Sequence, residues 1–94
     1  MRTINWSSSA KSEYALRTAK KAGLTEVAAR IIAAGPWGAF ELSESQVASL
    51  VGAVRADQAM LSSMAHEIQP AWAGEYYVLL NKGVERGLSE ALAA

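Results

Sequence analysis

One long segment without an interior stop constrains the fold of this chain most. Ser43 and Gln46 have the spacing of a helix capping box, and apolar residues stand on either side at the positions of a hydrophobic staple. No proline follows before Pro70. The sequence therefore predicts a single helix over about residues 44–69, roughly 37 Å long. A helix of this length is long for a globular protein, and we expect it to be the central element.

Glycine and proline divide the rest of the chain into three further helical segments. A run of serines ending at Ser9 supplies the N-cap of the first helix and Gly23 ends it; Thr25 caps the second and Gly35 ends it. The predicted helices cover about residues 9–22, 25–34, 44–69 and 70–92. No run shows the alternation of a strand. The sequence therefore predicts an all-α, compact four-helix single domain over residues 1–94, or five helices if Gly83 splits the last one.

The 44–69 helix has two unlike faces. One carries large apolar side chains at heptad spacing, namely Val47, Leu50, Val54, Leu61, Met64 and Ile68. The other carries only small residues, namely Ala48, Gly52, Ala56, Ala59 and Ser63. A solvated helix face usually carries Lys, Glu and Gln, so we expect burial on both sides. Gly83, Gly87 and Ala91 form a matching row on the last helix, which would allow the two helices to cross closely.

Asp57 interrupts the large apolar face of the 44–69 helix. A buried carboxylate without a partner costs several kcal/mol, so it must be paired, protonated or exposed. One interpretation is a polar residue that sets the register of a helix pair, including a pair across a homodimer. The other is solvent exposure, or an internal ion pair with Arg17, Lys20 or Arg86.

Composition excludes several classes of site. The chain of 94 residues is 51% hydrophobic and 19% charged, which is a globular rather than a disordered composition. It contains no cysteine, and His66 is the single histidine, so Cys-ligated and multi-His metal sites are excluded. His66 and Glu67 begin like the zincin motif, but Pro70 stands where that motif needs its second histidine. We therefore expect a protein that is not an enzyme and that uses no metal and no cofactor.

The longest stretches without a charged residue have ten residues. A membrane-spanning helix needs about 20, and the N-terminus has no apolar run of signal-peptide length. We therefore expect a cytoplasmic protein that does not bind membranes.

Charge is distributed unevenly although the net charge is zero. Residues 1–35 carry six basic and two acidic side chains, and residues 36–94 carry three basic and seven acidic ones. This polarity is consistent with a nucleic-acid-facing end, with attraction between the halves of the chain, or with head-to-tail association. Lys20 and Lys21 are the candidate contact residues within the basic half.

Residues 46–52 resemble the first helix and turn of a helix-turn-helix motif, with Ala48 and Gly52 at the positions that allow the close bend. The resemblance implies a nucleic-acid-binding transcriptional regulator, which is our alternative function. The continuation departs from the pattern. Gln58 occupies an apolar position, and residues 55–60 carry one basic side chain, whereas phosphate contacts normally need several.

The leading hypothesis is a protein–protein interaction module of the adaptor or inhibitor type, such as those that bacteriophages direct at host machinery. The large aromatic side chains at Trp6, Trp37, Phe40 and Trp72 lie near helix ends or in loops. There they either close the ends of the bundle or serve as interface anchors. The expected partner is another protein, or a second copy in a homodimer, rather than nucleic acid or a membrane. The candidate interaction residues are Trp37, Phe40, Trp72, Lys20, Lys21 and Asp57.

Overall fold

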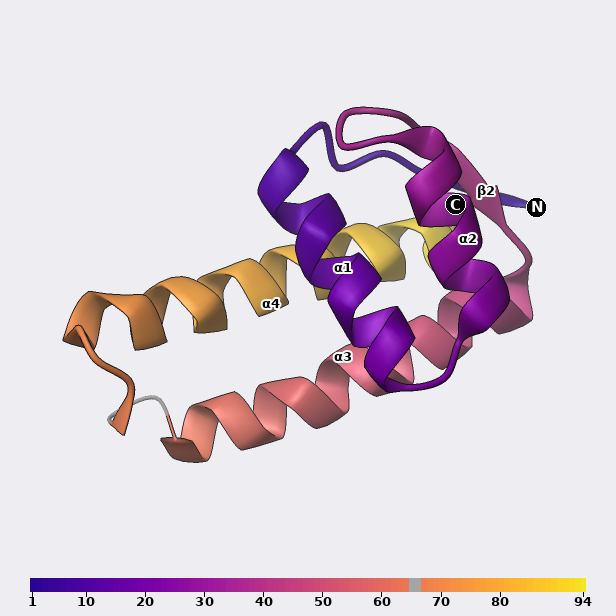
Figure 1. The fold of residues 1–94 in the computed structure, drawn as a ribbon. Coiled ribbons are helices and arrows are strands. Elements are labelled where there is room, and N and C mark those ends of the chain that lie inside the picture. The colour runs from indigo at the N-terminus through magenta and orange to yellow at the C-terminus, as the bar shows by residue number, and fades with distance from the viewer. Residues whose placement is uncertain (65–66) are drawn as a thin grey trace.

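A computed structural model describes residues 1–64 and 67–94 of the chain. In order, the elements of this described part are β1 (Arg2–Ile4), α1 (Ser9–Lys21), α2 (Thr25–Ala34), β2 (Phe40–Leu42), α3 (Glu44–Met64) and α4 (Ala71–Ala93). The compact four-helix fold expected from the sequence is confirmed. Figure 1 shows α3 and α4 running side by side as a hairpin, with α1, α2 and the strands gathered over one end of it.

The end of α1 forms a Schellman motif at the predicted glycine. Gly23 has a φ of +74°, and its N–H donates to the Lys20 carbonyl oxygen at 3.1 Å, while the Leu24 N–H donates to the Ala19 carbonyl oxygen at 2.9 Å. This motif places the Leu24 side chain against the core. Leu24 therefore becomes the N-cap of α2 without a side-chain hydrogen bond, and the cap predicted at Thr25 is wrong.

The capping box of α3 forms as predicted. The Ser43 N–H donates to Gln46 Oε1 at 2.9 Å, and the Gln46 N–H donates to Ser43 Oγ at 3.1 Å. The described helix ends at Met64, and residues 68–70 are not helical, so the predicted extension to residue 69 is wrong. In contrast, α4 runs through Gly83 without a break, which makes four helices rather than five in the described residues.

The two strands were not predicted. They pair antiparallel, with Ile4 opposite Phe40 and Arg2 opposite Leu42. Ile4, Phe40 and Leu42 are buried, whereas the intervening Thr3 and Glu41 are exposed. Three residues give too short an alternation to be recognised as a strand in the sequence. The pair forms because tertiary packing holds its apolar side chains in the core.

The core lies where the strands, α1 and α2 meet one half of the hairpin. Its largest fully buried side chains come from β1, β2, α3 and α4, namely Ile4, Leu42, Val47, Leu50, Val54, Asn81, Val84 and Leu88. The indole of Trp6 packs against the ring of Phe40 with 5.7 Å between the centroids. All buried residues of α3 lie in its first half, so the other end of the hairpin projects beyond the core (Figure 1).

The expectation that both faces of the long helix are buried is wrong. Every member of the small-residue face of α3 is exposed, namely Ala48, Gly52, Ala56, Ala59 and Ser63. Such side chains would bury little apolar area, so covering them offers little stabilisation. The matching glycine row of α4 contacts other groups. A Cβ on Gly87 would meet the indole of Trp6, and one on Gly83 would meet the side chain of Lys11.

Candidate functional site

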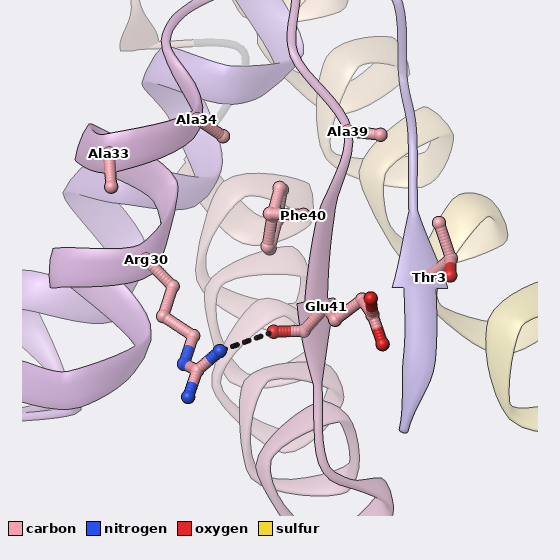
Figure 2. A pocket seen from close by; sticks show the side chains of 7 residues that line it. All are labelled: Thr3, Arg30, Ala33, Ala34, Ala39, Phe40 and Glu41. Carbon is pink, nitrogen blue, oxygen red and sulfur yellow. Dashed lines mark hydrogen bonds between the residues drawn. The ribbon is translucent and has the colours of Figure 1, made fainter.

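Two surface hollows are the candidate sites, and the larger offers little to a ligand. It has a volume of about 420 Å³ and lies between α2 and β2 (Figure 2). Its cation, Arg30, points across the hollow, donates to the Glu41 carbonyl oxygen at 3.5 Å and lies 4.0 Å from the Glu26 carboxylate. Alanine methyl groups and the edge of Phe40 form much of the remaining lining. The positive charge of Arg30 in this hollow is therefore already engaged within the protein.

The second hollow is a groove of about 370 Å³ that lies between α1, α3 and α4. We call it the three-helix groove. Its apolar lining comes from Met60, Leu61, Ile68 and Tyr77, and its polar lining from Tyr14, Arg17, Lys21 and Asp57. Apolar walls with a few convergent polar groups are typical of binding sites.

Asp57 is partly buried at the edge of the three-helix groove. Its side chain is only 16% exposed; Lys21 Nζ lies 2.9 Å from Oδ1, and Thr18 Oγ1 donates to Oδ2 at 3.0 Å. Asp57 is thus paired internally, but the predicted partners Arg17, Lys20 and Arg86 are wrong. Thr18 and Lys21 are three residues apart on α1, so both face α3 and reach the same carboxylate.

A buried hydrogen-bond network joins the three helices beside the groove. Asn81 Nδ2 donates to the Tyr14 hydroxyl at 2.7 Å and to the Val54 carbonyl oxygen at 2.9 Å. Burial raises the pKa of Tyr14, and the negative charge of Asp57 raises it further, against the opposing effects of the Asn81 hydrogen bond and the Lys21 charge. The phenol therefore stays protonated at neutral pH.

Arg17 is the cation of the groove that is free to bind a ligand. Its side chain is exposed and forms no ion pair with any residue that the structure describes, so a Glu13–Arg17 pair four residues apart on α1 is not formed. Lys20 is likewise exposed, but it does not line the groove. The groove thus combines apolar walls with one unpaired positive charge.

The structure scatters the residues that the sequence suggested as interaction sites. Lys21 and Asp57 line the three-helix groove. Trp37 is 66% exposed in the turn after α2, and Trp72 is 67% exposed at the start of α4. Phe40 is buried in the core. These three aromatic side chains therefore do not form one site with Lys21 and Asp57.

Sequence reasoning missed much of the groove, including Tyr14, Met60 and Tyr77. Asn81 was missed as well, although it carries a recognisable signal. It follows Tyr77 by four residues and precedes Val84 by three, so it is a polar residue within an apolar stripe of α4. Such a residue must find hydrogen-bond partners when the stripe is buried.

The turn suggested by the helix-turn-helix resemblance is wrong. Gly52 lies inside α3, which continues unbroken from Glu44 to Met64. Arg55, the one basic residue of the supposed recognition segment, lies 3.0 Å from Glu85 of α4 in an ion pair. Residues 46–60 are therefore one continuous helical segment.

Within the described residues, no group of three or more His, Asp or Glu side chains could hold a metal ion. His66, considered above for the zincin motif, lies outside the described residues. None of the described helices is long and apolar enough to cross a membrane. No protein-family model, no curated protein and no solved structure matches the chain.

Proposed function

We propose that this protein is a non-enzymatic binding module that recognises another protein through the three-helix groove. The observation that carries the proposal is the unpaired Arg17 beside the apolar walls of that groove. A partner segment with one apolar anchor and a neighbouring carboxylate would satisfy both features. Burial of the anchor supplies affinity, and the carboxylate sets the orientation.

Methionine at the mouth of the groove supports binding of a protein segment. Met60 lines the groove and is 46% exposed, as is Met64 one turn later. Methionine side chains are flexible and polarisable, so they adapt to apolar groups of varied shape. The adaptor or inhibitor type remains a prediction from the sequence. We do not propose nucleic-acid binding, because α3 does not turn at Gly52.

The proposal is tested by selecting random short peptides displayed on phage against the immobilised protein. We expect the selected peptides to combine a large apolar residue with Asp or Glu. Their affinity should fall about tenfold or more for Arg17→Glu, because the variant replaces an attraction by a repulsion. Met60→Glu should also weaken them, because it places a carboxylate at the apolar mouth.

Lys20→Glu is the matched control, because it makes the same change of charge on α1 outside the groove. It should affect peptide affinity much less than Arg17→Glu. Peptides without acidic residues, or equal losses for the two variants, would contradict the proposed function. A thermal melt of each variant verifies that it folds.

A further inference from the structure

The outward face of α4 carries large apolar and charged side chains that nothing in the described structure covers. Trp72 is 67% exposed and Leu79 is 68% exposed. Glu75, Lys82 and Arg86 are also exposed, and none of them forms an ion pair with a described residue. At 100° per residue these five side chains fall on one stripe of the helix, which we call the outer stripe. The stripe does not line the three-helix groove.

When two copies of the outer stripe run in opposite directions, unlike residues of the two copies lie opposite each other. Trp72 and Arg86 lie at equal distances on either side of Leu79, seven residues away in each direction. The midpoint between Glu75 and Lys82 falls between positions 78 and 79, which is within one residue of Leu79. A two-fold axis through Leu79 therefore brings unlike residues together in both halves of the stripe.

We propose that the outer stripe of α4 is a homodimer interface in which two copies of α4 pack antiparallel about Leu79. The two Leu79 side chains meet on the axis, and Glu75 of each copy pairs with Lys82 of the other. Trp72 of each copy lies opposite Arg86 of the other, which is a favourable cation–π arrangement. A parallel arrangement would place each charge against its like, so the charges select the antiparallel one.

Lys11 adds to this complementarity. A Cβ on Gly83 would lie 3.1 Å from Lys11 Cε, so the end of the Lys11 side chain lies over Gly83, next to Lys82 in the sequence. In the antiparallel register, Gly83 of one copy lies opposite Glu75 of the other. Each Glu75 carboxylate therefore meets two lysines of the other copy, namely Lys82 and the Lys11 side chain that lies over Gly83.

The first test is the mass of the intact protein by sedimentation equilibrium from about 1 μM to 1 mM, a range that includes weak dimers. We expect the mass to rise with concentration from 10.0 kDa towards twice that value. Leu79→Lys should keep the protein monomeric, because it places two like charges on the axis. Ile32→Lys, at a 57% exposed position on α2, is the matched control and should dimerise like the wild type. A wild-type protein that stays monomeric, or a dimer that survives Leu79→Lys, would overturn the proposal.

The second test is a charge exchange that depends on the register. Glu75→Lys alone and Lys82→Glu alone should each weaken the dimer about tenfold or more, because each homodimer then contains two repulsive pairs. Mixing the two variants should restore dimerisation, since both pairs of the mixed dimer again join unlike charges. The two substituted side chains face each other in one pair, and the native Glu75 faces the native Lys82 in the other.

Isotope labelling of one variant identifies the mixed dimer by mass. Failure of the mixture to recover while each variant keeps its wild-type melting temperature would rule out the antiparallel register.

Discussion

The indole ring of Trp6 occupies the space that a side chain on Gly87 would fill. A Cβ at position 87 would lie 2.5 Å from Nε1 and 2.7 Å from Cδ1 of the ring. The segment between β1 and α1 is thereby docked directly on the backbone of α4. Gly87 is needed for this close approach, whereas in an open helix position glycine only reduces stability.

Gly87→Ala is therefore expected to lower the free energy of unfolding by about 1–3 kcal/mol, because the new methyl group displaces the indole. Gly52→Ala is the matched control, since a Cβ at position 52 meets nothing within 4 Å. That variant should be about 0.5–1 kcal/mol more stable than the wild type. Urea unfolding of the three proteins measures the difference. Stabilisation by both substitutions would contradict the packing of Trp6 on α4.

Asn81→Ala is expected to lower the free energy of unfolding by about 2–4 kcal/mol. The substitution removes both hydrogen bonds of Asn81 Nδ2 and leaves a cavity in the core. Tyr14→Phe removes only the acceptor of one of these bonds and should cost less. A double-mutant cycle between the two positions should give a coupling of about 0.5–3 kcal/mol. Strict additivity would show that the Asn81–Tyr14 hydrogen bond contributes nothing.

Lys21→Ala is expected to cost about 0.2–1 kcal/mol of stability, because Lys21 is largely exposed and its ion pair with Asp57 is screened by water. Lys20→Ala changes the same residue type one position earlier, outside any ion pair that the described residues form, and should leave stability unchanged. Chemical unfolding at low and high salt distinguishes the two. The difference between the variants should shrink as salt rises.

The stability of the protein is expected to fall above about pH 10, in part because of Tyr14. Its pKa is raised in the folded state, so the unfolded chain loses this proton at lower pH and ionisation favours unfolding. The stability that protonated Tyr14 contributes is present in full below about pH 10. It is lost as the pH rises towards the pKa of Tyr14 in the folded protein. Tyr14→Phe should therefore show a shallower decline between about pH 10 and 11 than the wild type. Unfolding near pH 7, where the phenol is protonated in both states, provides the reference. Equal slopes of stability against pH for the wild type and Tyr14→Phe would argue against a raised pKa of Tyr14.

Local signals in the sequence located the helices well. The capping box at Ser43 and Gln46 and the glycine end of α1 form as predicted, because each depends only on residues within a few positions of one another. The strand pair was not predictable in the same way. Ile4 and Phe40 are 36 positions apart, and neither strand is long enough to show its own period.

The candidate sites depended more strongly on tertiary structure. Asp57 was recognisable as a residue that needs a partner, since a carboxylate in an apolar stripe cannot remain buried and unpaired. Which cation approaches it is decided by the rotation of α1 against α3, and that rotation selected Lys21 over Arg17 and Lys20. Exposure of the small face of α3 was decided in the same way, by which side the other elements cover.

The sequence by itself determined the helices and the residues that require partners, because these follow from short-range hydrogen bonds and side-chain chemistry. Only the tertiary structure decided the partners, the groove and the uncovered face of α4, because these depend on how whole helices pack.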